Sequence, residues 1–211
     1  MKLGKWISAA AAFFALTTMT PSNAQTGLNK LADLCLGGQP NAQVRIEVFS
    51  DYQCPACRTF YLETLKPLIA DYTKANKIDK IYIAYHDFPL AMHPFARKAS
   101  KFALAAMRIG RDRWLRVSDV LYMEQAKWES DGKIEAVLAK VLDPTELVRI
   151  QSLAANPAID AALNQEIQLG QSQNVTSTPT FFIYSQSGRQ QRVATGVSLA
   201  VLKDFLDRLI S

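Results

Sequence analysis

The tetrapeptide Cys54-Pro55-Ala56-Cys57 constrains this chain more than any other feature, because it places two thiols within one helical turn. Residues 44–49, just before it, form an apolar and β-prone run, and residues 58–70 have the pattern of a helix. Proline is favourable at a first helical position, since the N–H there has no helical partner. The sequence therefore predicts a strand, a sharp turn, and a helix whose N-terminal end carries both cysteines.

The N-terminal end of this helix favours a reactive sulfur at Cys54. Unpaired N–H groups and the positive end of the helix dipole stabilise a thiolate there. A zinc site needs two further ligands, but the sequence offers only Cys35 and two histidines at no zinc-ligand spacing. A haem attachment site needs histidine after Cys57, where Arg58 stands. A purely structural disulfide stays open, although so short a loop adds only about 2 kcal/mol of stability. We expect redox exchange and no metal.

Residues 1–24 have the pattern of a signal peptide that is removed from the mature chain. Two lysines precede an apolar run at residues 6–16, which is too short to span a bilayer comfortably. Ser22-Asn23-Ala24 has the small residues of a cleavage site, so we expect cleavage after Ala24 and export to the periplasm. An uncleaved anchor is the alternative. Export would place the cysteines in an oxidising compartment, where disulfides persist.

Charge and cysteine count narrow the class of protein further. The net charge of +5 comes from scattered basic residues with no basic block, which indicates a solvated surface and no nucleic-acid partner. Three cysteines leave one over after Cys54 and Cys57 pair. We interpret the remainder, Cys35, as a partly buried small residue, with intermolecular pairing as its alternative.

Hydrophobic periodicity predicts the order strand, helix, strand, helical block, hairpin and helix, after a short N-terminal helix. Helix starts are predicted at Asp143-Pro144, Asn156-Pro157 and Ser198, which have capping side chains. The expected elements are a helix over 28–36, strands over 44–49, 78–85, 180–184 and 190–194, and a hairpin turn at 185–188. A parallel unit followed by a hairpin predicts a mixed sheet with helices on both sides.

Three segments resemble the DsbA-like branch of the thioredoxin superfamily. Phe49-Ser50-Asp51-Tyr52-Gln53-Cys54-Pro55-Ala56-Cys57 is similar to its active-site segment. Val175-Thr176-Ser177-Thr178-Pro179-Thr180-Phe181-Phe182-Ile183 is similar to its cis-proline loop and the strand that follows. Asp87-Phe88-Pro89-Leu90 and His93-Pro94 resemble the beginning of its helical insertion. The resemblance implies an α/β thioredoxin-like fold, a mixed sheet built as strand–helix–strand then hairpin–helix, with a helical insertion.

These observations together predict the organisation of the chain. Residues 1–24 are the signal peptide and 25–43 an N-terminal helix and turn. Residues 44–90 and 175–211 form the thioredoxin-like domain, and 91–174 form the helical insertion.

The resemblance also implies roles for the site residues. Cys54 is the sulfur that substrates attack, and Cys57 is the buried resolving thiol. Thr178 precedes a cis Pro179 and offers main-chain hydrogen bonds to an extended substrate, by β-strand addition. Pro55 and Ala56, the dipeptide between the cysteines, lack the histidine that many DsbA proteins carry there, so a weaker oxidant is expected.

Glu47 and Asp51 are the predicted candidates for proton transfer to Cys57. Relatives of thioredoxin often have a buried acid on the strand before the motif. The matching position here holds Val48, and a shift of one residue along a strand reverses its face. Surface or capping roles are the alternative for both acids, and the two histidines are expected to be structural.

The combined prediction is an exported thiol–disulfide oxidoreductase that forms disulfides in secreted proteins. The resemblance implies reduced secreted proteins as substrates, no bound cofactor, a monomer, and reoxidation by a quinone-linked membrane partner of the DsbB or VKOR type. A disulfide isomerase or reductase is one alternative. The other is a non-catalytic peptide-binding chaperone module with a structural disulfide.

Overall fold

The computed structural model describes residues 34–185, 190–194 and 196–211. The described residues belong to one compact unit. The predicted signal peptide, the first part of the predicted N-terminal helix and most of the predicted hairpin turn lie outside the described residues. No helix of the described ranges is long and apolar enough to cross a membrane.

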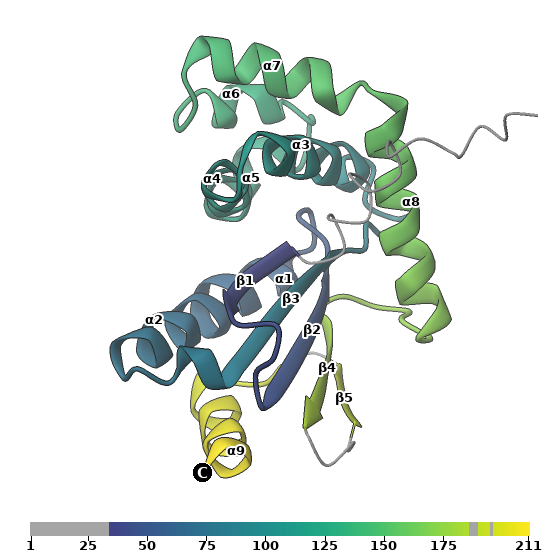
Figure 1. Cartoon of the computed structure of the whole chain (residues 1–211). Helices are drawn as coiled ribbons and strands as arrows, with labels where there is room; N and C mark the ends of the chain where they lie inside the picture. The colour runs from purple at the N-terminus through teal and green to yellow at the C-terminus, as the bar shows by residue number, and fades with distance from the viewer. Residues whose placement is uncertain (1–33, 186–189, 195) are drawn as a thin grey trace, which may run out of the picture. The chain divides into compact units, whose positions relative to one another are not determined.

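A mixed sheet of five strands, counted over the described residues, forms the centre of this unit (Figure 1). Its spatial order is β1-β3-β2-β4-β5. The strands are β1 (Leu34–Gly38), β2 (Val44–Ser50), β3 (Ile81–Asp87), β4 (Thr180–Ser185) and β5 (Gln190–Ala194). The pair β2 and β3 is parallel, whereas the three other pairs are antiparallel. The predicted mixed sheet is therefore confirmed.

The first strand corrects the predicted helix at residues 28–36. Residues 34–38 pair antiparallel with β3, with Leu34 opposite Tyr85 and an irregularity between Cys35 and Gly37. The buried leucines at 34 and 36 alternate as in a strand, and the open edge of β3 supplies the backbone partners. Hydrogen bonding to the edge of the sheet therefore determined the conformation of this segment. The segment is too short for its helical periodicity to predict a helix reliably.

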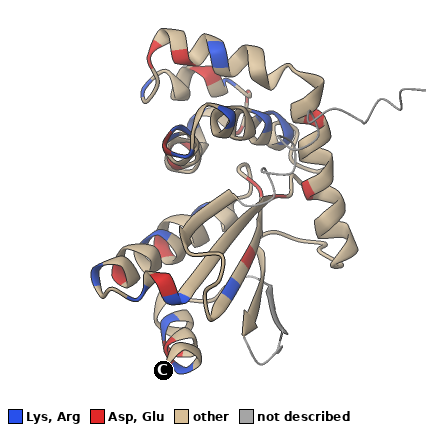
Figure 2. Cartoon of the chain, in the orientation of Figure 1, with Lys and Arg blue, Asp and Glu red and all other residues tan. Residues whose placement is uncertain are grey.

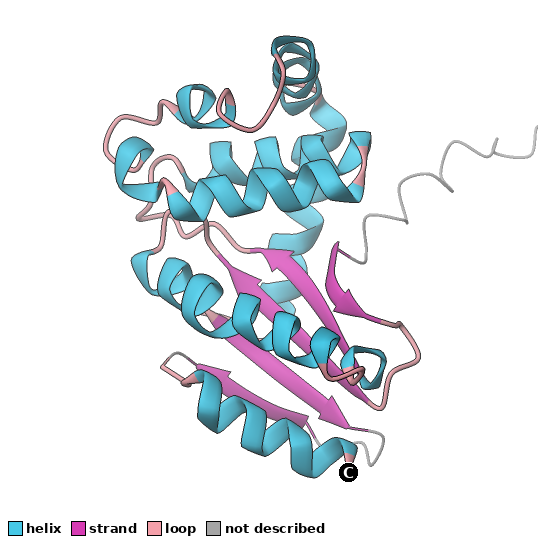
Figure 3. Ribbon diagram, turned by 90° about the vertical axis from the view of Figure 1, so that its left-hand side faces the viewer, coloured by secondary structure: helices cyan, strands magenta, loops and turns pink. Residues whose placement is uncertain are grey.

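One face of the sheet is covered by the helices that begin at the cysteine motif and by the C-terminal helix (Figure 3). They are α1 (Pro55–Phe60), a π-helical segment η2 (Tyr61–Leu65), α2 (Lys66–Lys74) and α9 (Leu199–Ile210). The predicted single helix after the motif thus contains a π-helical turn, a feature that often marks functional sites. Val44, Ile46 and Val48 of β2 share a hydrophobic core with these helices.

The opposite face of the sheet packs against α8 (Pro157–Ser172). Phe49, Phe88, Val175 and Phe182 form a separate buried cluster there. Phe49 lies T-shaped against both Phe88 and Phe182, with ring centroids 6.2 and 6.0 Å apart. Because side chains of a strand alternate in direction, neighbouring residues of β2 enter different cores.

The helical insertion begins after β3 and continues to α8 (Figure 1). Its other helices are α3 (Ala96–Ile109), α4 (Arg111–Met123), α5 (Gln125–Trp128), α6 (Ile134–Leu138) and α7 (Pro144–Ala154). The predicted caps are confirmed, since Asp143 accepts from the Glu146 N–H, Asn156 from the Ala158 N–H, and Ser198 from the Val201 N–H. The sequence did not predict α6. Basic and acidic residues are interspersed over the helices (Figure 2).

Candidate active site

The two cysteines lie at the beginning of α1, where the predicted turn from β2 is held by Asp51. The Asp51 carboxylate accepts a hydrogen bond from the Gln53 N–H at 2.7 Å, and the Asp51 backbone carbonyl accepts one from the Cys54 N–H at 3.1 Å. Cys54 is the extended residue before the helix, with φ −75° and ψ 120°, and proline follows it at the first helical position. This Asx turn brings both sulfurs to the N-terminal end of α1.

The Cys54 sulfur lies beside the loop before β4. Its thiol donates to the carbonyl oxygen of Thr178 at 3.4 Å, and the Thr178–Pro179 bond is cis, as the resemblance implied. Cys54 is 7% exposed whereas Cys57 is fully buried. Both cysteines are free thiols in this structure. Cys54 is therefore the more accessible residue of the pair, and the roles predicted for the two cysteines stay predictions.

The surroundings of Cys54 favour its thiolate. A hydrogen bond from the Cys57 side chain is the largest cause, and it outweighs burial to lower the pKa of Cys54 to about 6. The backbone N–H groups of Cys57 and Ala56 and the Thr178 hydroxyl contribute in the same direction. The N-terminal end of the helix thus lowers the pKa of Cys54 as expected, but the neighbouring Cys57 thiol lowers it more.

Cys57 has the opposite character. Burial raises the pKa of Cys57 well above its usual value, and the Cys54 sulfur adds to this rise. The Asp51 N–H donates to the Cys57 sulfur at 3.4 Å, and the Ser50 hydroxyl is close enough to stabilise a charge there. The pair therefore contains one stabilised thiolate and one buried thiol that holds its proton.

Asp51 is fully buried, and its carboxylate joins two loops. Besides the Gln53 N–H, it accepts from the Leu90 N–H at 2.8 Å and from His93 Nδ1 at 2.7 Å. The predicted structural role of His93 fits this contact. The carboxylate of Asp51 thus fixes the cysteine turn against the loop after β3. The role of Asp51 in proton transfer stays a prediction.

The structure does not bring Glu47 to the cysteines. Its carboxylate accepts from Arg45 at 2.8 Å, from Gln173 at 3.2 Å and from the Tyr184 hydroxyl at 3.3 Å. Glu47 is paired opposite Phe182, on the α8 face of the sheet, whereas Val48 faces the core that contains Cys57. Burial raises the pKa of Glu47, but hydrogen bonds from Arg45 and Gln173 outweigh it and lower the value. This position does not favour proton transfer to Cys57.

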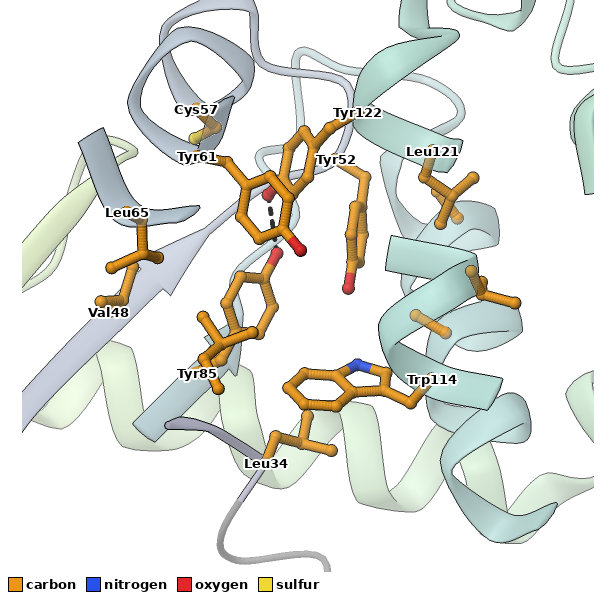
Figure 4. Packing of buried hydrophobic residues seen from close by; sticks show 14 of the residues in the cluster. Leu34, Val48, Tyr52, Cys57, Tyr61, Leu65, Tyr85, Trp114, Leu121 and Tyr122 are labelled. Atoms are coloured by element: carbon orange, nitrogen blue, oxygen red, sulfur yellow. Dashed lines mark hydrogen bonds between the residues drawn. The ribbon is translucent and has the colours of Figure 1, made fainter. Parts of the chain in front are cut away.

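A group that the sequence analysis did not select lies beside Cys57: a buried cluster of tyrosines, among them Tyr52, Tyr85 and Tyr122 (Figure 4). Ser50 Oγ and the Tyr122 hydroxyl are 2.7 Å apart, and the Tyr122 and Tyr85 hydroxyls are also 2.7 Å apart. Asp87, which begins the segment that resembles the start of the helical insertion, is fully buried at the end of β3. The alternation of Ile81, Ile83 and Tyr85 along β3, extended by two residues, would have placed Asp87 on the cysteine face.

One surface hollow lies at the beginning of α1, and another lies farther along, beside η2 and α2. One of about 350 Å³ is lined by Ala56, Thr59, Phe60 and Val197, among others. A second of about 580 Å³ is lined by Arg58, Leu62, Lys66 and Met123, among others. Pro55 and Ala56 themselves are exposed, as are Thr176 and Ser177 of the loop before the cis-proline. A polypeptide could therefore approach Cys54 from the side of these exposed segments.

A mixed sheet with a dithiol at the start of its first long helix, a cis-proline beside it and a helical insertion defines a thioredoxin-like fold. A family model described as thioredoxin matches residues 32–204, and the chain belongs to this thioredoxin family. These residues include both cysteines and the cis-proline, so the match covers the whole candidate site.

Individual relatives and solved structures are similar to the chain over most of its length. The "Probable disulfide bond formation protein D" of Bacillus cereus is 21% identical over 154 residues, covering 69% of this chain and 68% of that protein. The DsbA2 structure of Pseudomonas aeruginosa is similar with a TM-score of 0.64 and 23% identity, covering 84% of this chain and 94% of that one. The α-DsbA1 structure of Wolbachia pipientis gives a TM-score of 0.68 and 17% identity, covering 84% and 90%. The solved structures confirm the predicted fold with its insertion.

Proposed function

We propose that this protein is a thiol–disulfide oxidoreductase that introduces disulfides into other polypeptides. The observation that carries the proposal is the contrast within the dithiol. The Cys54 thiolate is stabilised beside the cis-proline loop, while Cys57 is buried and retains its proton. A stabilised thiolate favours the reduced protein, so the oxidised form gives its disulfide to substrates. The name of the Bacillus cereus relative supports this direction.

The reaction begins with a disulfide between Cys54 and Cys57. A substrate thiolate attacks the Cys54 sulfur, the bond between the two cysteines breaks, and Cys57 leaves with the electron pair and takes up a proton. The second substrate thiolate then attacks the substrate sulfur of the mixed disulfide, and Cys54 leaves as a stabilised thiolate. The substrate is oxidised by two electrons, and the dithiol of the protein is reduced by two.

The loop before β4 would hold the substrate during this exchange. The main chain of Thr178 lies beside the Cys54 sulfur, so an extended peptide bound along this loop brings its own sulfur to the site. Main-chain pairing of this kind accepts many sequences. The hollows beside α1 provide room for the flanking side chains of the substrate.

The cellular setting belongs to the same proposal. We infer export to the periplasm after cleavage of residues 1–24, with reduced secreted proteins as substrates. Reoxidation falls to a quinone-linked membrane partner of the DsbB or VKOR type, and the protein acts as a monomer without a bound cofactor. Support comes from the signal-like sequence and from the resemblance to DsbA proteins.

Refolding of reduced ribonuclease A, together with a redox titration of the dithiol, tests the proposal. We expect the oxidised protein to restore ribonuclease activity and the Cys54→Ser variant to fail. A titration midpoint more oxidising than that of thioredoxin, about −270 mV, supports an oxidase. A more reducing midpoint would favour a reductase. Unchanged protection of clients by Cys54→Ser, with no dithiol oxidation by the wild type, would favour the chaperone alternative and contradict the proposal.

A further inference from the structure

The two surface hollows lie on different sides of the helical stretch that begins at the cysteine motif. The hollow of about 350 Å³ takes its helical lining from positions 56, 59, 60, 63 and 64. The hollow of about 580 Å³ takes its own from positions 58, 62, 66, 67 and 70. Residues three or four apart share one side of a helix, so the two sets are separated around it. A polypeptide that reaches Cys54 therefore has two different surfaces to follow.

The charged residues that line the two hollows have opposite signs. Among the described residues, Glu63 is the charged residue that lines the first hollow. The second hollow is lined by Arg58 and Lys66, with no acidic residue in its described lining, and we call it the basic hollow. Its other lining residues are apolar: Leu62, Pro67, Ala70 and Met123. The basic hollow therefore combines positive charge with apolar surface.

Arg58 gives the basic hollow a charge that a ligand can use. Its Nε donates to the backbone carbonyl of Tyr122 at 3.1 Å, and no carboxylate of the described residues pairs with its guanidinium. The side chain is partly buried, so the bond to α4 holds the guanidinium in one place. A guanidinium has five N–H groups in a planar fork, and those on Nη1 and Nη2 suit a carboxylate. Arg58 is therefore a positioned cation without an internal counter-ion in the described part of the chain.

Lys66 helps to build the wall of the basic hollow. Its ammonium group lies 2.9 Å from the Asp119 carboxylate of α4, and the Tyr61 hydroxyl donates to the same carboxylate at 2.7 Å. The Tyr61 ring also stacks on Tyr122, with ring centroids 4.6 Å apart (Figure 4). These contacts fix η2 and the beginning of α2 against α4. Because Asp119 offsets the charge of Lys66, the charge left for a ligand is that of Arg58.

Met123, the last residue of α4, supplies the exposed apolar part of the basic hollow. Its side chain is 60% exposed, whereas Leu62 and Pro67 across the hollow are partly buried. Methionine is flexible and polarisable, so it packs against apolar side chains of many shapes. An apolar side chain of a partner can therefore cover Met123 while a neighbouring carboxylate meets Arg58. Charge complementarity selects an acidic partner segment over a basic one.

The basic hollow begins within reach of a polypeptide held at Cys54. The Arg58 N–H donates to the Cys54 carbonyl at 3.1 Å, so Arg58 lies one helical turn beyond Cys54. One turn rises about 5.4 Å, and an extended peptide advances about 3.3 Å per residue. A side chain two or three residues from the substrate cysteine can therefore meet Arg58.

We propose that the basic hollow is a specificity subsite for partner polypeptides that carry an acidic side chain next to an apolar one, two or three residues from the cysteine that exchanges with Cys54. Arg58 binds the carboxylate, and Met123 packs against the apolar side chain. Glu63 in the other hollow repels the same acidic flank, so the two hollows together set the direction in which the polypeptide crosses α1. This inference rests on the proposed function and leaves its exchange steps unchanged.

The test combines protein variants with synthetic peptides in a double-mutant cycle. Each peptide has a reacting cysteine, a second cysteine on a flexible Gly-Ser linker, and one pair of residues at the second and third positions on both sides of the reacting cysteine. The pair is Glu-Leu, Gln-Leu or Lys-Leu, and its presence on both sides removes any assumption about direction. Single-turnover reduction of the oxidised protein is followed at one pH by acid quenching and thiol counting.

The measured quantity is the rate with the Glu-Leu peptide divided by the rate with the Gln-Leu peptide. Dividing this ratio for the wild type by the ratio for Arg58→Gln cancels the ionisation of the peptides and any change in Cys54 itself. We expect a quotient of about two to five at low salt, as for partly exposed charge pairs. The quotient should approach one in about 1 M salt, because the interaction is electrostatic. The Lys-Leu peptide should give a quotient below one.

Lys74→Gln is the matched control, because it removes one exposed positive charge of α2 outside the basic hollow. Its quotient should be one, whereas Arg58→Lys should keep most of the wild-type preference. Met123→Ser should reduce the preference for leucine over serine beside the glutamate, which tests the subsite even if Arg58→Gln folds poorly.

Two results would overturn the subsite while leaving the oxidoreductase function intact. One is a quotient of one for Arg58→Gln together with an unchanged leucine preference in Met123→Ser. The other is an equal quotient for Lys74→Gln and Arg58→Gln, which would show an effect of net charge alone. A wild-type protein that oxidises none of the peptides would contradict the proposed function, and the subsite with it.

Discussion

The thiol of Cys54 donates to the backbone carbonyl of Thr178 at 3.4 Å, although 124 positions separate the two residues in sequence. The helical insertion occupies most of that interval, so the segment that contacts the Cys54 sulfur follows the insertion in the sequence. The contact joins the sulfur that is predicted to exchange with substrates to the segment that would bind them. It therefore makes the reactivity of one element depend on the placement of the other.

The first prediction concerns the ionisation of Cys54. Absorbance at 240 nm of the reduced protein should show a thiolate that titrates with a midpoint of about 6, and Cys54→Ser should lack this transition. Because the pKa is lowered from 9.0, the thiolate contributes stability to the reduced fold that is complete above the ordinary thiol pKa. That contribution is lost as the pH falls through about 6. A midpoint near 9 would contradict the prediction.

Thr178→Val should weaken the protein as an oxidant. The Thr178 hydroxyl is buried with no hydrogen-bond partner of its own among the described residues, and it lowers the pKa of Cys54. Its loss should cost the thiolate about 1 kcal/mol, which corresponds to a pKa about 0.7 higher and a potential about 20 mV more reducing. A glutathione titration measures the potential. Thr176→Val, at an exposed position of the same loop, should leave it unchanged.

Asp87→Asn should stabilise the fold at pH 7. The raised pKa of Asp87 means that the folded state binds its proton more tightly than the unfolded state does. Its contribution to stability is therefore complete below pH 3.8 and is lost as the pH rises towards the folded-state pKa. Asparagine avoids this loss, so urea unfolding should show a gain of about 1–3 kcal/mol at pH 7 that shrinks at pH 4.

Glu47→Gln provides the control for this stability measurement, with the opposite sign. The pKa of Glu47 is lowered in the fold, so its carboxylate stabilises the protein above pH 4.5. The variant should lose stability at pH 7 and approach the wild type at acidic pH. Equal shifts of the same sign in both variants would contradict the environments described for the two carboxyl groups.

Gly38→Ala should destabilise the edge of the sheet. Gly38 has a φ of +85°, and a Cβ atom there would lie 1.6 Å from the Ile81 carbonyl oxygen, so the backbone of β1 or β3 would have to move. Thermal unfolding should show a loss of at least about 2 kcal/mol. Gly110→Ala is the control, since a Cβ at that position meets nothing within 4 Å. Equal stability of the two variants would argue against β1 as a paired strand.

Short-range chemistry made several parts of the fold predictable. The caps at Asp143, Asn156 and Ser198 each depend on hydrogen bonds within one helical turn, so the sequence pattern was sufficient. The strand before the motif and the proline-started helix after it follow from apolar runs and local backbone preference. The π-helical segment at Tyr61–Leu65 had no such local signal.

The sequence by itself determined the dithiol at a helix start and the strands and helices that surround it, because neighbouring residues decide those features. Only the tertiary structure decided that β1 is a strand, that Glu47 faces away from the cysteines, and that Asp87 is fully buried. The reason is physical: the face of a strand residue and the depth of its burial depend on which distant strands and helices pack against it. The ionisation of a buried carboxyl group follows from that packing.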